Sequence, residues 1–259
     1  MGRAEAHVST PYDRIGTRYR RTRQTDPSLM AAILGALGDA KTIVNVGAGS
    51  GSYEPPGTVA AIEPSRVMIA QRPLGAAPAI QASAERIPLP DDFADAAMAL
   101  WTVHHWSDPV AGIGELRRIA GRVVIVSWEA HLTRQFWLVR DYLPHVAAYD
   151  DSRTPTPAQL AELLGDSAEV HPLPIPHDCR DGFLGAYWRR PERYLDPAVR
   201  AGISSLAALE DTLGEGLARL ADDISSGEWA RRHADLLELE ELDIGYRLIV
   251  ADSTATASA

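Results

Sequence analysis

Three glycines directly follow a short apolar run, and this junction restricts the fold more than any other feature of the sequence. Residues 42–46 are mostly apolar and rich in β-branched side chains, as buried parallel strands usually are. Gly47, Gly49 and Gly51 come immediately afterwards. Glycine lets the backbone turn sharply, and it lets a ligand approach where a Cβ would collide. The pattern therefore predicts a buried strand that ends in a ligand-binding turn.

Short apolar runs alternate with helical stretches along most of the chain. This alternation predicts a mostly parallel sheet with right-handed crossovers. Helices between the last two strands are expected to form an insertion that caps the sheet. One helix is predicted to begin at Asp26-Pro27, where the aspartate caps it, and to end at Gly38. Its buried face is expected to carry Leu29, Ile33, Leu34 and Leu37. Further strands are predicted at 58–62, 79–81, 95–101, 122–128, 169–175 and 245–251, and helices at 65–71, 109–120, 135–148, 157–164 and over most of 196–241.

Charge and cysteine content narrow the classes of partner and the compartment. The chain has 259 residues and a formal charge of −10, which argues against nucleic acid because affinity for it comes mostly from Lys and Arg. The single cysteine, Cys179, excludes an intramolecular disulfide and fits a reducing compartment. No signal segment or membrane-spanning run is apparent. We expect a soluble cytoplasmic protein, monomeric or homodimeric, with no nucleic-acid or membrane partner. The one basic cluster is interpreted as a solvated helix face, with an anion-binding role for one member left open: Arg14, Arg18, Arg20, Arg21 and Arg23.

An acidic residue and two prolines give the glycine turn its chemical meaning. Glu63 ends the second predicted strand, sixteen residues after Gly47, where a carboxylate can accept both hydroxyls of a ribose. Pro55 and Pro56 forbid a helix interior after the turn, so no helix N-terminus stands there to bind a pyrophosphate. The third glycine also falls one place early for the dinucleotide spacing. These features favour S-adenosylmethionine, which carries a sulfonium and no phosphate, over a nicotinamide or flavin. A turn that serves only the path of the chain stays open as the alternative.

Four segments in this order carry a family resemblance: VNVGAGSGSY, AIEPS, ASAERIPLPDDFAD and ALWTVHHWSDP, followed by GIGELRRI. Each is weak alone, but together the stretch 12–129 resembles the class I S-adenosylmethionine-dependent methyltransferases. The likeness is strongest to the broad type 11 group, which includes the quinone-biosynthesis enzymes. The resemblance implies an α/β Rossmann-like sheet of seven strands with the last one antiparallel. It also implies an N-terminal helical lid (1–40), a cofactor-binding core (41–130), the rest of the sheet with a helical substrate cap before the last strand (131–251), and a tail (252–259).

The resemblance also implies S-adenosylmethionine as cofactor, S-adenosylhomocysteine as product, and a role for each matching residue. The glycines would pass under the methionine and ribose parts, with Glu63 on the ribose hydroxyls. The sequence departs from the family pattern in three places: Asn45 replaces the usual acid, Ser83 stands where aspartate is common, and the helix after the turn is truncated. Adenine recognition is therefore expected to use Glu85 or main chain. The residues expected at the cofactor, including two tyrosines of the lid, are Tyr12, Tyr19, Asn45, Gly47, Ala48, Gly49, Gly51, Glu63, Pro64, Ser65, Ser83, Ala84, Glu85, Trp101 and Thr102.

The chemistry of methyl transfer needs positioning more than a fixed catalytic constellation. The nucleophile must lie about 3 Å from the methyl carbon, in line with the sulfur, and a base helps only where a proton must leave. His104 and His105 follow a predicted strand at the ligand-binding edge, so they are candidates for base or substrate contact. Packing within the loop is the alternative for both. Pro176-His177-Asp178-Cys179 is too sparse for a metal site, and no metal is expected.

The predicted function is methyl transfer to an O, N or C atom of a small organic molecule. Aromatic residues in the cap, namely Tyr142, Tyr149, Phe183, Tyr187 and Trp188, favour a partly apolar acceptor. Two rival functions remain: a non-methylating protein that binds S-adenosylmethionine, and an NAD(P)-dependent oxidoreductase. Residues expected at the acceptor are Trp106, His177, Tyr187 and Trp188, with Asp181 as a possible companion.

Overall fold

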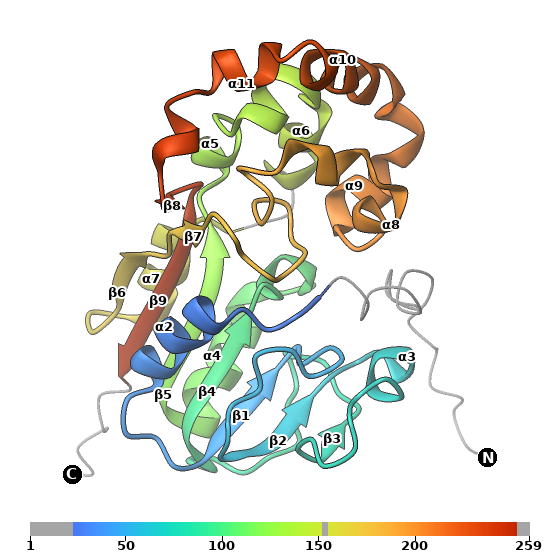
Figure 1. Ribbon diagram of the computed structural model, residues 1–259. Coiled ribbons are helices and arrows are strands. Elements are labelled where there is room, and N and C mark those ends of the chain that lie inside the picture. The colour runs from blue at the N-terminus through green and yellow to red at the C-terminus, as the bar shows by residue number, and fades with distance from the viewer. Residues whose placement is uncertain (1–22, 152–154, 253–259) are drawn as a thin grey trace.

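The computed structural model describes residues 23–151 and 155–252, and a seven-stranded sheet lies at its centre (Figure 1). The strand order is β3-β2-β1-β4-β5-β9-β6. Neighbours from β3 to β5 are parallel, whereas β9 runs antiparallel to both β5 and β6. The predicted seven strands with an antiparallel last one are confirmed. The strands are β1 (Ile43–Val46), β2 (Thr58–Ile62), β3 (Ala79–Ile80), β4 (Ala94–Leu100), β5 (Ala120–Trp128), β6 (Glu169–Pro172) and β9 (Tyr246–Asp252).

The predicted strand 169–175 is two strands in the structure. β6 ends at Pro172, and β7 (Ile175–Pro176) pairs instead with β8 (Glu241–Leu242) in a separate two-stranded sheet. The division has a simple cause, because Pro172 and Pro174 have no N–H to donate to a continuous ladder.

Helices cover both faces of the sheet. α2 (Pro27–Leu37) contacts β5 and β9 on one face, while α4 (Pro109–Ile119) and α7 (Pro157–Leu164) lie on the other. Side chains of β5 alternate between the two cores, since Val124 and Val126 pack with α2 whereas Val123 and Ile125 pack with α4. Among the described residues, no helix has the length and apolar character that a membrane crossing needs.

The start of α2 follows its sequence, but one predicted core residue does not. The side chain of Asp26 accepts hydrogen bonds from the backbone N–H groups of Ser28 and Leu29, as an N-cap should. Leu29, Ile33 and Leu37 are buried at a spacing of four, whereas Leu34 is 42% exposed. The prediction that Leu34 shares the buried face is therefore wrong. Leu34 follows Ile33 directly, so its side chain is rotated by about 100° around the helix and falls outside the narrow buried stripe.

The helical cap is built from two insertions. One lies between β7 and β8, as predicted, and a second follows β5 directly. The predicted helix 135–148 is interrupted here, because Pro144 separates a π-helical turn, η2 (Leu138–Tyr142), from α6 (His145–Asp151). Figure 1 shows the cap helices gathered beyond the carboxyl ends of β4 and β5. The other cap elements are α5 (Ala130–Thr133), η3 (Pro191–Leu195), α8 (Pro197–Arg200), α9 (Ser204–Leu209), η4 (Glu210–Thr212), α10 (Gly214–Ser225), α11 (Glu228–Arg232) and η5 (Leu236–Glu238).

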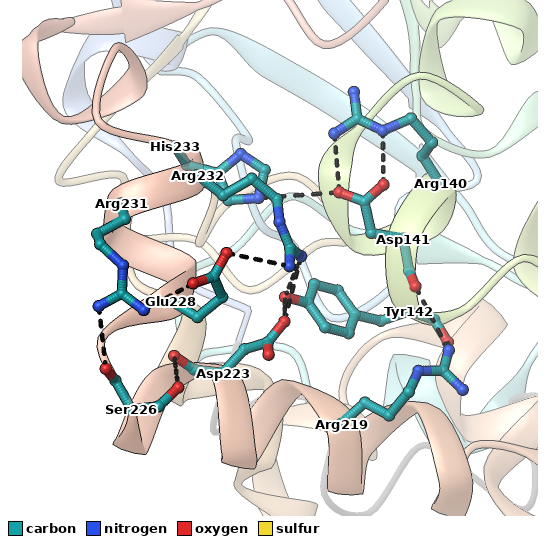
Figure 2. A network of polar contacts seen from close by, with 10 residues as sticks. All are labelled: Arg140, Asp141, Tyr142, Arg219, Asp223, Ser226, Glu228, Arg231, Arg232 and His233. Atoms are coloured by element: carbon teal, nitrogen blue, oxygen red, sulfur yellow. Dashed lines mark hydrogen bonds and ion pairs between the residues drawn. The ribbon is translucent and has the colours of Figure 1, made fainter.

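A polar network joins the two insertions (Figure 2). The Tyr142 hydroxyl donates a hydrogen bond to Asp223 Oδ2 at 2.6 Å, and Arg232 Nη1 donates to the same oxygen at 3.1 Å. α10 passes so close to η2 that a Cβ on Gly216 would overlap the Tyr142 carbonyl oxygen. Beneath the network, the ring of Trp137 packs edge-on against Trp229 at 5.1 Å. The two insertions therefore pack together as one cap, and its core is continuous with the core on the α2 face of the sheet.

Candidate active site

The glycine turn after β1 has the backbone that its sequence predicts. Gly47, Gly49 and Gly51 all have positive φ, at 68°, 52° and 94°, a region that other residues adopt only with strain. The N–H groups of Gly47 and Ala48 donate to the Ile62 carbonyl at the end of β2, at 2.8 and 3.0 Å. A Cβ on Gly47 would overlap the side chain of Thr102. Both the conformation and the close approach therefore require glycine at position 47.

Glu63 joins the turn to the end of β2. It is 5% exposed, and its two carboxylate oxygens accept from the N–H of Gly49 and the N–H of Ser65, each at 2.8 Å. Ser65 in turn caps α3 (Arg66–Ile69) by accepting from the N–H of Met68. Glu63 therefore fixes the positions of the glycine turn and the start of α3 relative to the end of β2.

No helix lies between β1 and β2, as Pro55 and Pro56 predict. The connecting loop is held instead by side chains. Tyr53 has a positive φ of 58°, its backbone N–H donates to Thr25 Oγ1, and its hydroxyl accepts from the N–H of Asp26. The loop that follows the glycine turn is therefore tied to the segment that leads into α2.

The residues predicted near adenine form the edge of the site beyond β3. Ser83 and Pro64 are exposed, and Ala84 is buried. Glu85 Oε1 accepts from the N–H and hydroxyl of Ser107, at 2.7 and 2.9 Å. Partial burial by itself raises the pKa of Glu85, but hydrogen bonds outweigh it and hold the pKa below its usual range. This carboxylate therefore holds the loop before α4.

Trp101 lies where the sheet meets the cap. The predicted strand 95–101 ends at Leu100, and Trp101 has a left-handed φ of 50°, which is unusual for a bulky residue. Its ring stacks on Phe183 of the cap at 5.5 Å and 25°, and it lies 5.2 Å from the ring of Tyr53. The buried indole N–H has no hydrogen-bond partner among the described residues. Thr102, the next residue, packs against Gly47.

A buried ion pair joins the N-terminal segment to the cap at the same place. Arg23 Nε and Nη2 bind the two carboxylate oxygens of Asp181 at 2.8 and 3.1 Å, and the Asp181 side chain is fully buried. The Arg23 guanidinium also lies 5.8 Å from the centre of the Trp101 ring. The interpretation of Arg23 as part of a solvated face is therefore wrong. The ion pair with Asp181, which is 158 residues away in sequence, holds the Arg23 side chain in a buried position.

The histidine pair follows β4 in a short 3₁₀ turn, η1 (Val103–His105). His104 is half-buried, and its ring meets the edge of Trp128 at the end of β5 at 4.7 Å. His105 is exposed and its ring lies 3.6 Å from that of His104. His104 therefore lies on the side of the turn that faces the neighbouring strand end.

Four residues predicted at the acceptor are not brought together. Trp106 packs on α4, so closely that a Cβ on Gly112 would overlap its ring. His177 contacts Glu240 beside the small β7–β8 sheet. Trp188 is fully buried, and its indole N–H donates to the Ile175 carbonyl, which makes it a core residue of the cap. Tyr187 is also buried, and the guanidinium groups of Arg190 and Arg193 lie 5.0 and 5.3 Å from its ring centre.

Other aromatic residues occupy the junction instead. Phe183 was expected only as a general cap aromatic, and Tyr53, Trp128 and Tyr246 were not expected at the site. Tyr246 meets Phe183 edge-on at 4.9 Å. Trp128 and Tyr246 had a positional signal, since the end of β5 and the start of antiparallel β9 share one sheet edge. Tyr53 has no such signal, because its contacts depend on how the irregular loop folds back.

Two further expectations concern the cysteine and the lid. Cys179 is fully buried, and burial raises the pKa of its thiol to about 12, so it is not a thiolate at neutral pH. Among residues 23–151 and 155–252, no group of three or more His, Cys, Asp or Glu side chains converges as metal ligands do. Tyr12 and Tyr19 lie outside the described residues.

Comparison with known proteins agrees with the geometry. Residues 44–123 match the family model described as "Methyltransferase domain". A protein of Anabaena variabilis, described as a methyltransferase from an antibiotic biosynthesis pathway, is 34% identical with a TM-score of 0.81, covering 88% of this chain and 98% of its own. An S-adenosylmethionine-dependent methyltransferase of Thermotoga maritima shares the fold at 15% identity and a TM-score of 0.53, covering 94% of each chain. No curated protein gives a significant match.

The chain belongs to the class I S-adenosylmethionine-dependent methyltransferases. S-adenosylmethionine is its cofactor and S-adenosylhomocysteine its product, so the oxidoreductase alternative is set aside. The sheet order agrees with this assignment, because the order reverses between β1 and β4, where open α/β sheets bind their ligands.

Proposed function

We propose that this enzyme methylates an O, N or C atom of a small organic molecule held between the sheet edge and the cap. The observation that carries the proposal is the stacking of Trp101, directly after β4, on Phe183 of the cap. This contact brings Phe183 of the cap to the end of β4, where the next residue, Thr102, packs against Gly47 of the glycine turn. An acceptor placed there would lie next to the methyl donor, as in-line transfer requires.

The residues around the turn fit S-adenosylmethionine. The positive φ values of the glycines produce a sharp turn directly after β1, and the Glu63 carboxylate lies beside this turn, where ribose hydroxyls would be placed. The connection from β1 to β2 lacks a helix, which suits a ligand without phosphate. When bound, the cofactor supplies an electrophilic methyl carbon on a sulfonium. We assign its binding to Asn45, Gly47, Ala48, Gly49, Gly51, Glu63, Pro64, Ser65, Ser83, Ala84, Trp101 and Thr102.

The lid is the second part of the proposed binding site. The segment at Arg23 and Gln24 lies against the site, since both residues bind Asp181 of the cap loop. The lid is proposed with the predicted bounds, residues 1–40, and within its described part α2 packs on the sheet. We retain a monomer or homodimer as the expected assembly.

His104 is the proposed base where the acceptor must lose a proton. It is half-buried against Trp128, at the edge where donor and acceptor would meet. The ring of His105, tilted by 47° against that of His104, lies on the exposed side of the same turn. A histidine titrates near neutral pH, so it can accept a proton from a hydroxyl or amine during the reaction.

The nature of the junction indicates the class of acceptor. Trp101, Phe183, Trp128 and Tyr246 surround it with aromatic surface, which favours a partly apolar or aromatic molecule. The description of the Anabaena protein supports the same class, since it places a relative in the biosynthesis of an antibiotic.

A panel assay tests the proposal. Purified enzyme is incubated with methyl-deuterated S-adenosylmethionine and, in separate reactions, with small phenols, amines and carbon acids, with bulk protein, and with nucleic acid; product masses are measured with the S-adenosylhomocysteine formed. We expect at least one aromatic small molecule to gain a labelled methyl group. Labelling of protein or nucleic acid instead, with no small molecule labelled, would overturn the proposal.

The base is tested separately with the active acceptor. His104→Gln is expected to lower kcat by about 10²–10⁴-fold and to remove the acidic limb of the pH profile. His105→Gln should keep that limb and most of the rate. Equal losses in both variants, with an unchanged profile, would assign the pair to loop packing.

A further inference from the structure

Beneath the glycine turn lies a buried ion pair that the cofactor motif does not include. Arg72 Nη2 binds the two carboxylate oxygens of Glu54 at 2.8 and 2.6 Å, and the side chains are only 5% and 9% exposed. Glu54 Oε1 also accepts from the N–H of Ala77, and Arg72 Nη2 also donates to the Ala77 carbonyl. A buried pair of this kind is strongly destabilising to break from one side only.

Both members of the pair touch the turn. Asn45 Nδ2, at the end of β1, donates to Glu54 Oε2 at 3.4 Å. Arg72 Nη1 lies 3.4 Å from the position that a Cβ on Gly51 would take. That same Nη1 is buried and has no hydrogen-bond partner among the described residues. The pair therefore occupies the space beside residues 45 and 51, where the chain has a proline-interrupted loop and no helix.

Charge is the feature that separates the two ligands of this turn. S-adenosylmethionine carries a sulfonium cation, whereas S-adenosylhomocysteine carries a neutral thioether and is otherwise the same molecule. A buried charge near the turn acts on the difference between them, because buried charges are screened far less than exposed ones. Arg72 alone would repel the sulfonium, and Glu54 alone would attract it.

We propose that Glu54 and Arg72 are positioning residues that support the glycine turn as a charge-balanced pair, and that each neutralises the other so that no buried charge biases the turn between the cationic cofactor and its neutral product. The same contact explains Asn45. An aspartate there would place a second carboxylate against buried Glu54, whereas the amide of Asn45 donates a hydrogen bond to it.

Calorimetric titration of S-adenosylmethionine and S-adenosylhomocysteine tests the proposal through the ratio of their Kd values. In Glu54→Gln the unbalanced Arg72 should weaken S-adenosylmethionine about tenfold more than S-adenosylhomocysteine, because an uncompensated buried cation repels the sulfonium and not the thioether. Arg72→Gln should shift the ratio in the opposite direction. The double variant, Glu54→Gln with Arg72→Gln, is neutral again and should restore the wild-type ratio.

The cap supplies the matched control. Arg200 and Glu210 form a similar pair at 2.7 Å, with Arg200 buried and Glu210 partly exposed. Glu210→Gln should leave the ratio unchanged even where it lowers stability. If the single variants at Glu54 and Arg72 shift the ratio in the same direction, or leave it unchanged, the proposal is overturned. Should Glu54→Gln not fold, Arg72→Gln and the double variant still decide the matter.

Discussion

At the glycine turn, Gly47 and Glu63 each satisfy two structural requirements at once. Gly47 has a φ of 68° and also lies against the Thr102 side chain, with no room for a Cβ. Glu63 holds Gly49 and Ser65 by their N–H groups and is itself buried at the end of β2. These local features decide whether the cofactor can approach the backbone.

Gly47→Ala is expected to abolish measurable cofactor binding. The left-handed backbone alone costs about 1–2 kcal/mol for alanine, and the overlap with Thr102 forces the turn or the end of β4 to move. Calorimetry with S-adenosylhomocysteine measures the loss. Gly75→Ala is the control: it also has a positive φ, at 86°, but a Cβ there would meet no atom. Equal affinity in the two variants would contradict the assignment of the turn.

Glu63→Gln is expected to weaken S-adenosylmethionine and S-adenosylhomocysteine by roughly 10–100-fold each, since a hydrogen bond to a charged group contributes about 1.5–3 kcal/mol. Both ligands carry the ribose, so both should lose affinity. Asp95→Asn is the matched control. Asp95 also accepts hydrogen bonds from backbone N–H groups, those of Lys41 and Thr42, but it lies at the amino end of β4, away from the glycine turn. Loss of affinity in Asp95→Asn alone would be contrary to the proposed site.

At the scale of elements, the cap shows how irregular helices still form a packed unit. Pro144 ends η2, and the network around Asp223 and Arg232 then holds this turn against α10 and α11 (Figure 2). His233 closes α11 with its ring between Trp137 and Trp229, at 5.7 and 5.1 Å. Burial lowers the pKa of His233, while the nearby Asp141 opposes that shift.

The cap is expected to lose stability in mild acid. Because the pKa of His233 is lower in the folded than in the unfolded protein, the unfolded state binds more protons. The stability that neutral His233 contributes is complete above the pKa of histidine in the unfolded protein, about 6.5. This stability declines as the pH falls from there towards the lower pKa of His233 in the folded protein. The slope from this one group is at most about 1.4 kcal/mol per pH unit.

Urea unfolding at pH 7.5, 6.5 and 5.5 measures this effect. His233→Gln should flatten the decline, whereas His171→Gln, at an exposed histidine on β6, should not. An identical pH dependence in wild type and His233→Gln would assign the acid sensitivity to other groups.

At the scale of the whole molecule, one short segment connects three parts. Residues 23–26 bind Asp181 and Arg180 of the cap loop and Tyr53 of the turn loop before entering α2. Trp101 lies at the centre of the same junction and contacts Arg23, Tyr53 and Phe183. The loop after the glycine turn, the cap and residues 23–26 therefore contact one another at one place.

Asp181→Asn is expected to destabilise the protein by about 3 kcal/mol, because it leaves Arg23 buried without its counter-charge. For a chain of this size that corresponds to a fall in Tm of roughly 6–12 °C. Thermal unfolding measures it. Glu228→Gln is the control, since the Arg231–Glu228 pair is largely exposed and contributes about 0–1 kcal/mol. A change in Asp181→Asn no larger than in the control would exclude the connecting role.

Local sequence determined the strand, the glycine turn, the acid after β2, the cap of α2 and the absence of a helix after the turn. Each of these features depends on residues that are close in sequence. Glycine adopts a positive φ, proline has no N–H to donate, and the short connection from β1 to β2 places Glu63 beside the turn. The family resemblance rested on the same segments, which is why fold and cofactor could be predicted together.

Tertiary structure alone decided which side chains meet. Trp188 and Phe183 lie five residues apart in the same apolar, aromatic stretch, yet the first is core of the cap and the second contacts Trp101. Arg23 pairs with Asp181, and Asn45 with a glutamate from an irregular loop. Periodicity reports that a residue is buried but not its partner, because the partner depends on how distant segments pack. The turn was therefore predictable from sequence, whereas the side-chain contacts between the sheet and the cap were not.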